Sequence, residues 1–204
     1  MWEILQSIEF SRFSTWVREG ELVLGYTTTL ALHSFGMAFL VGLSAMVALR
    51  VLGVAPSLPL APLDRFFPLM WISFWVNAVT GVVLFSLAPT SLVTNAVFGI
   101  KMVFVAAAVA SVRLLRTNVF GDPATLDTRP VLTKNKALAA ASLALWIVAI
   151  TAGRLTAYPI WIVPQQALAV LIVVVMLIAG CIAARLSRLN RSARQARLVT
   201  STNS

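Results

Sequence analysis

The sequence predicts an all-α membrane protein, and its composition, its apolar runs and the placement of its basic residues support this prediction. Hydrophobic residues make up 59% of the 204 residues and charged residues 11%, and the mean hydropathy is +0.90. A soluble domain of this length needs a more polar surface, so the composition indicates an integral membrane protein. The net charge is +9, but the basic residues flank apolar runs instead of forming one patch. No nucleic-acid partner is therefore expected.

Five apolar runs are long enough to cross a hydrocarbon core, which takes about 20 helical residues. They cover residues 21–50, 65–87, 91–116, 135–158 and 164–188. Backbone groups find no water in lipid, and the runs are too long and too rich in Leu, Ala and Val for barrel strands, so five transmembrane helices in a bundle are expected. Asp64 is expected to be the N-cap of the second helix. The whole chain, residues 1–204, then forms a single polytopic membrane domain.

Two further segments flank the spans. Residues 2–18 mix apolar with charged side chains at a loosely helical period, which predicts one interfacial helix lying on the membrane. Residues 189–204 form a basic tail after the last span.

The distribution of basic residues predicts the orientation. With five spans, one side of the membrane carries Arg50, Arg65, Arg113, Arg116, Arg129, Lys134, Lys136, Arg185, Arg188, Arg191, Arg194 and Arg197. The other side has Arg12, Arg18, Lys101 and Arg154, together with Glu3, Glu9, Glu19 and Glu21. Because cytoplasmic loops carry the excess of Lys and Arg, the N-terminus is expected in the periplasm and the C-terminus in the cytoplasm of a bacterial inner membrane.

Four of the predicted spans each place one strongly polar residue within the outer half of the membrane. These are His33, the only histidine, with Asn77, Lys101 and Arg154, and the span bounds place all four in the outer half of the membrane, with His33 near its midplane. Polar groups at this depth are costly and mark functional sites. Small or hydroxyl-bearing residues share their helical faces: Gly25, Thr29 and Gly36 beside His33, and Ser73, Thr80 and Gly81 beside Asn77, bordered by Trp71 and Trp75. The predicted ligand-binding residues are His33, Asn77, Lys101, Arg154, Thr29 and Trp75.

Each of these residues also has a structural interpretation, which stays open. His33 and Asn77 are both capable of forming ordinary hydrogen bonds between helices. The stem of Lys101 is long enough to carry its ammonium group to the interface, and Arg154 is close enough to the surface to anchor in the head-group layer.

The chemistry of such a site favours binding over catalysis. Two cations, an imidazole and an amide form a positive pocket that suits an anionic or carbonyl-bearing ligand, such as a lipid phosphate, a carboxylate or a quinone oxygen. No metal site is expected, because one histidine and the distant Cys181 do not supply a ligand set. Catalytic motifs are absent from the sequence. Haem b is the alternative cofactor, with His33 as ligand and Met37, Met70, Met102 or the His33 of a second copy on the other side.

Several short motifs resemble a family of small multi-spanning bacterial inner-membrane proteins described as a domain of unknown function. The matching stretches lie between residues 13 and 158 and include Gly25-Tyr26-Thr27, Leu32-His33-Ser34-Phe35-Gly36, Phe67-Pro68-Leu69-Met70-Trp71, Phe74-Trp75-Val76-Asn77, Phe98-x-x-Lys101 and Ile150-Thr151-Ala152-Gly153-Arg154-Leu155. The resemblance implies a shared fold and an inner-membrane location, but no activity. A looser likeness to cytochrome b561 and copper-resistance membrane domains is one of fold only, and the chain lacks a second histidine.

The sequence therefore predicts a non-enzymatic ligand-binding or accessory subunit with an outward-facing cationic site. A haem- or quinol-dependent electron-transfer subunit and a small-solute transporter are the alternatives. The transporter is weakened by the absence of carboxylates within the spans. Membrane lipids are expected partners, and the uncharged fifth span is expected to face lipid, another protein or a second copy of the chain.

Overall fold

The computed structural model describes residues 1–20, 25–54, 56–121 and 131–158, together with Pro164, Gln165, Leu168 and Ile172. The chain divides into two units, Met1–Thr156 and Ala157–Ser204, and every assigned helix belongs to the first. Apart from those four residues, the predicted fifth span, with its docking role, and the basic tail lie outside the described residues.

Four membrane-length segments dominate the first unit. The long helices are α3 (Tyr26–Val51), α4 (Phe67–Ser86), α6 (Ala96–Val119) and α7 (Thr133–Leu155), and α4 continues directly from the 3-10 helix η1 (Ala61–Phe66). Each of these segments, with η1 and α4 taken together, is long and apolar enough to cross a membrane. The helical class is thereby confirmed, and four of the five predicted spans each correspond to one helical segment of sufficient length and hydropathy. No strand occurs among the residues described.

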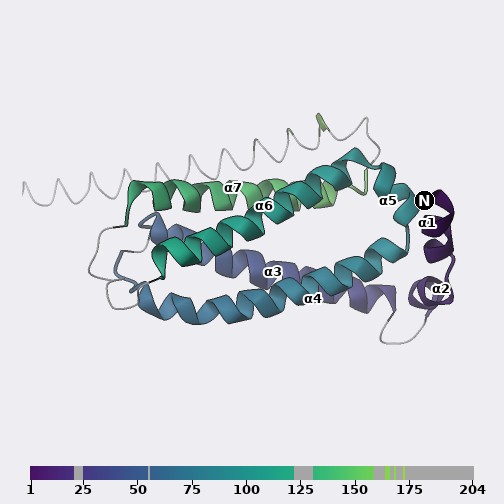
Figure 1. Cartoon of the computed structure of the whole chain (residues 1–204), viewed down its shortest axis with the longest axis horizontal. Helices are drawn as coiled ribbons and strands as arrows, with labels where there is room; N and C mark the ends of the chain where they lie inside the picture. The colour runs from purple at the N-terminus through teal and green to yellow at the C-terminus, as the bar shows by residue number, and fades with distance from the viewer. Residues whose placement is uncertain are drawn as a thin grey trace, which may run out of the picture. The chain divides into compact units, whose positions relative to one another are not determined.

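The long helices pack as two antiparallel pairs. Helix α3 packs along α4, α6 packs along α7, and contacts between α3 and α7 join the pairs (Figure 1). This order leaves α4 and α6 facing each other along a fourth boundary, the α4–α6 seam. In the view of Figure 1 the two helices run apart along this seam, toward the end of the bundle where α1 and α2 lie.

Polarity in this bundle is distributed as in a membrane protein. Large apolar side chains point outward, with Val82 68% and Val103 67% exposed, whereas Ser44, Ser111 and Ser142 are buried between helices. Water would penalise such a surface, but lipid tails solvate it, and small hydroxyl residues inside let helices approach each other.

Two short helices lie across one end of the bundle, called here the α1–α2 end (Figure 1). They are α1 (Trp2–Glu9) and α2 (Arg12–Glu19), so the prediction of one continuous helix over residues 2–18 is wrong. The chain breaks because Ser11 acts as an N-cap, its hydroxyl accepting a hydrogen bond from the backbone N–H of Ser14 at 3.2 Å.

Polar contacts attach these two helices to the end of α4. The buried hydroxyl of Ser14 donates to the Ser86 carbonyl at 3.0 Å, and Arg18 donates to the Leu87 carbonyl at 2.6 Å. The Glu9 carboxylate accepts from the hydroxyl of Thr90. The α1–α2 end is therefore closed by a cap that is bonded to the long helices.

Two local predictions about helix starts are also wrong. The predicted span over residues 91–116 is divided into α5 (Pro89–Thr94) and α6, because the side chain of Asn95 accepts from the backbone N–H of Val97 at 2.9 Å and starts a new helix. Asp64 does not cap the second span. It lies inside η1 and forms an ion pair with Arg116 at 3.4 Å, while α4 begins without a side-chain cap.

Candidate functional site

The two small-residue faces predicted on the first and second spans meet in the structure. A Cβ atom at Gly36 of α3 would lie 2.9 Å from the backbone nitrogen of Asn77 and 3.0 Å from the Ser73 carbonyl, both on α4. A Cβ atom at Gly81 of α4 would lie 3.2 Å from Cε1 of His33. Glycine at these two positions lets the helix backbones come together and lets the imidazole lie flat against α4.

His33 and Asn77 bond each other's backbone in both directions. Nδ1 of His33 lies 2.9 Å from the Asn77 carbonyl oxygen, and Nδ2 of Asn77 donates to the His33 carbonyl oxygen at 2.8 Å. We call this pair the His33–Asn77 clamp. It confirms that both residues form hydrogen bonds between helices.

The clamp also determines which imidazole nitrogen is free. A carbonyl oxygen only accepts hydrogen bonds, so Nδ1 carries the hydrogen that it shares with Asn77. The hydrogen bonds of Thr80 support this assignment of the hydrogen to Nδ1. The Thr80 hydroxyl donates its hydrogen to the Val76 carbonyl at 2.6 Å, so it accepts a hydrogen bond from Nδ1 at 3.1 Å. In the neutral ring Nε2 then holds a lone pair, for which the described residues provide no hydrogen-bond partner.

Lys101 reaches toward the same region from α6. Its stem lies along Gly153 of α7, where a Cβ atom would be 3.6 Å from Cε, and its ammonium group lies 5.8 Å from the ring centre of Phe98. The side chain is half-buried, and the described residues supply no hydrogen-bond acceptor or carboxylate to the ammonium group.

Helical register puts these groups at one level. His33 lies seven residues after the start of α3, Lys101 five after the start of α6 and Thr80 six before the end of α4. At 1.5 Å per residue they are about 10, 8 and 9 Å from the helix ends at the α1–α2 end. His33 therefore lies nearer to the α1–α2 end of α3 than to its middle, because α3 begins at Tyr26 rather than at residue 21. Its expected place near the midplane of the membrane stays a prediction.

The side chains of the other predicted ligand-binding residues form no hydrogen bond with His33 or Lys101 in the described part of the chain. Thr29 is buried one turn from His33 and bonds the carbonyl of Gly25 at 3.2 Å. Trp75 is 62% exposed on the outside of α4, and Arg154 is exposed in the last turn of α7. Within the described part of the chain, no recorded interaction connects Trp75 or Arg154 with His33 or Lys101.

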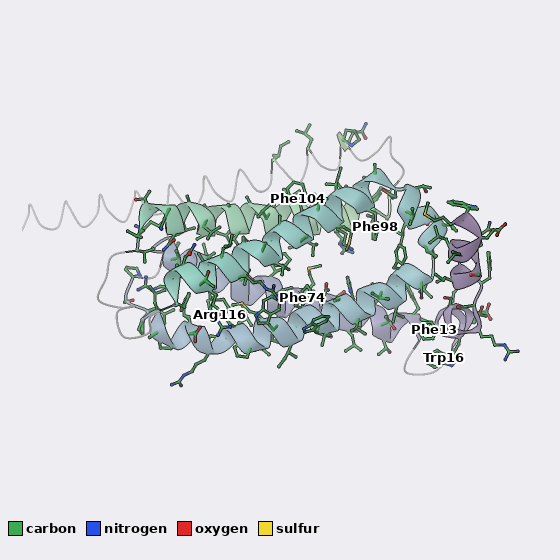
Figure 2. All side chains as sticks on the ribbon, in the orientation of Figure 1. Phe13, Trp16, Phe74, Phe98, Phe104 and Arg116 are labelled. Atoms are coloured by element: carbon green, nitrogen blue, oxygen red, sulfur yellow. The ribbon has the colours of Figure 1, made fainter. Side chains whose placement is uncertain are left out.

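An aromatic pair that the sequence analysis missed lies next to the site. The rings of Phe85 on α4 and Phe98 on α6 stack at 5.8 Å with an interplanar angle of 22°. Figure 2 shows Phe98 nearer the α1–α2 end than Phe74 and Arg116. Spacing would have indicated the pair, since Phe85 lies one turn after Gly81 and Phe98 lies three residues before Lys101.

Comparisons of the chain with protein-family models, with curated proteins and with solved structures find no match. The family resemblance and the looser likeness to cytochrome b561 thus stay predictions. Function has to be argued from the site itself.

Proposed function

We propose that this protein is a non-enzymatic ligand-binding or accessory subunit of a membrane, with a site formed by His33, Asn77 and Lys101. The observation that carries the proposal is the half-buried ammonium group of Lys101, which meets an aromatic ring but no hydrogen-bond acceptor among the described residues. A cation among apolar helices is costly unless an acceptor neutralises or solvates it. A ligand oxygen would provide that acceptor.

The surroundings of the ammonium group suggest what kind of ligand it is. Helix α7 provides Gly153 along the lysine stem, and α6 provides the Phe98 ring, so the environment is apolar apart from the cation and the imidazole. Such a site suits a molecule with an apolar body and one oxygen group, which includes anionic lipids and quinones.

The proposal includes five spans in a bacterial inner membrane, with the α1–α2 end in the periplasm. In support, Arg50 and Arg116 lie in the last turns of α3 and α6, and Arg113 lies about one turn before Arg116. Lys134 and Lys136 lie in the first turn of α7, and all five residues are away from the α1–α2 end. Helices α1 and α2 expose Trp2, Phe13 and Trp16, and Figure 2 shows Phe13 and Trp16 next to each other on α2. Aromatic side chains of this kind favour the head-group layer.

Reporter fusions test this topology. Alkaline phosphatase inserted after Thr94, between α5 and α6, is expected to be active, because that connection lies at the periplasmic end. Green fluorescent protein fused after Ser204 is expected to fluoresce in the cytoplasm. The reverse pattern at both positions would contradict the orientation, and a periplasmic C-terminus alone would contradict the fifth span.

Replacing Lys101 by methionine is expected to remove the bound ligand. Methionine keeps the length of the stem against Gly153 but has no charge, so the ligand loses its charged hydrogen bond and about tenfold or more in retention. Mass spectrometry of organic extracts from the purified protein measures the retained lipids and quinones.

Lys136→Met is the matched control, because Lys136 is exposed in the first turn of α7 at the opposite end of the bundle. The control is expected to retain the ligand as the wild type does. Equal retention by the wild type and Lys101→Met, or no retained molecule in the wild type, would contradict the proposal.

A haem-binding electron-transfer subunit is the second candidate, and one observation favours it. The carbonyl of Asn77 holds Nδ1–H of His33 and leaves Nε2 free, which is the arrangement that orients histidine ligands of metals. The apolar cavity described between α3, α4 and α6 has a volume of about 10 Å³, far below the usual size of a cofactor site. It is lined by Leu40, Met70, Trp71, Phe74, Val109 and Val112. A Soret band that disappears in His33→Ala would establish haem and overturn the first proposal.

A further inference from the structure

Hydrogen-bonding capacity at the site narrows the class of ligand. Resting on the proposed function, we infer that the ligand is a lipid-soluble hydroquinone, whose hydroxyl donates to Nε2 of His33 and accepts from Nζ of Lys101. The observation that carries this inference is a lone pair on α3 and an ammonium group on α6 at the same level of the bundle, neither with a hydrogen-bond partner among the described residues. The Phe98 ring beside the ammonium group stacks on Phe85, which lies one turn from Gly81, and Gly81 packs against the imidazole.

Ligand oxygens differ in whether they are able to form hydrogen bonds with both Nε2 of His33 and the ammonium group of Lys101. A quinone carbonyl, a carboxylate and a phosphate diester only accept hydrogen bonds, so each would serve Lys101 and leave Nε2 facing another acceptor. A hydroxyl group both donates and accepts. Because the Asn77 carbonyl already uses Nδ1–H of His33, the ring in its neutral form has no second hydrogen to offer, and a hydroxyl is the better complement.

The route into the site favours a molecule that travels in the membrane. The stacked rings of Phe85 and Phe98 connect α4 and α6 about one turn closer to the α1–α2 end than Gly81 and Lys101. Beyond them, α1 and α2 are bonded to the end of α4 through Ser14. A ligand arriving from water along the bundle axis would have to displace both the α1–α2 pair and the stacked rings of Phe85 and Phe98.

The α4–α6 seam remains as the way in. Further from the α1–α2 end the two helices meet again, where the Arg113 guanidinium lies 4.5 Å from the ring centre of Trp71. Between this contact and the Phe85–Phe98 stack, α4 and α6 expose large apolar side chains, among them Val79, Val82 and Val103. Entry from the side, between these two helices, would suit an apolar quinol better than a small water-soluble acid.

Equilibrium binding to the full chain in nanodiscs tests the inference. The probes are decyl-ubiquinol under anaerobic conditions, decyl-ubiquinone, and the dimethyl ether of the quinol, which has the same ring but no hydroxyl donor. The quinol is expected to bind about tenfold more tightly than either of the others, because only it bonds Nε2.

Two variants test which side chains cause the tighter binding of the quinol. Asparagine at position 33 places an amide nitrogen near the Nδ1 position, so His33→Asn keeps the donor to Asn77 and lacks Nε2; it is expected to bind the quinol only as tightly as the quinone. Lys101→Met is expected to weaken the binding of both forms. The comparison of quinol with ether in the wild type needs no variant, so misfolding of a variant does not affect it.

Failure of the inference is distinguishable from failure of the proposed function. Equal affinities for quinol, quinone and ether, or a preference for the quinol that survives in His33→Asn, would overturn the inference. If Lys101→Met still weakens binding or lipid retention in that case, the proposed function stands. If no probe binds and Lys101→Met changes no retained molecule, both are overturned.

Discussion

Valine at position 36 is expected to force α3 away from α4 and to lower the free energy of unfolding by about 3 kcal/mol. The Cβ atom alone would lie 2.9 Å from a backbone nitrogen and 3.0 Å from a backbone oxygen of α4. Backbone atoms of a packed helix do not move aside as a flexible side chain does, so the helices must separate. The separation would also break the His33–Asn77 clamp one turn away.

Gly42→Val is the matched control for this change. Gly42 lies on the same helix, and a Cβ atom there meets nothing within 4 Å. It is expected to change the free energy of unfolding by no more than about 0.5 kcal/mol, the difference in helix propensity. Titration with sodium dodecyl sulfate from a mild detergent, followed by circular dichroism, measures both variants. Equal stability of Gly36→Val and Gly42→Val would show that α3 and α4 do not pack closely at Gly36.

Removing both halves of the His33–Asn77 clamp is expected to lower the free energy of unfolding by about 2 kcal/mol, since one hydrogen bond between membrane helices contributes about 1 kcal/mol. Each bond runs from one side chain to the other residue's backbone. His33→Leu therefore removes one bond and Asn77→Leu the other. The double variant measures their sum, and a double-mutant cycle measures their coupling.

Retaining the donor at position 33 provides the control for the clamp. His33→Asn keeps an N–H group near the Asn77 carbonyl and is expected to lie within about 0.5 kcal/mol of the wild type. The same detergent titration applies. If the double variant were as stable as the wild type, the clamp would not hold α3 to α4.

Much of the fold follows from the sequence because a bilayer restricts the options. A chain in lipid must satisfy its backbone internally, so apolar runs of sufficient length become helices. The predicted bounds 65–87 and 135–158 agree closely with α4 and α7. Errors occurred where a single side chain decides where a helix starts, as Ser11 does for α2 and Asn95 for α6.

Less of the site was predictable, although its main residues were. His33, Asn77 and Lys101 could be chosen because polar groups are rare within spans. Trp75 was chosen for its place beside Asn77, yet it points outward, since neighbouring residues of a helix face directions about 100° apart. The stacking of Phe85 on Phe98 was not predicted, because it joins two helices and depends on which of their faces meet.

The sequence by itself determined that this is a helical membrane protein, where four of its long helices lie, and which polar residues lie within them. Only the tertiary structure decided that Nδ1 of His33 is used by Asn77, and that Nε2 and Lys101 lack hydrogen-bond partners among the described residues. It also decided that the side chains of Trp75 and Arg154 are exposed. The physical reason is that these spans are apolar on all sides. In a soluble helix the polar stripe shows which face is buried, but lipid and protein interior are equally apolar, so the facing side is set by packing between helices.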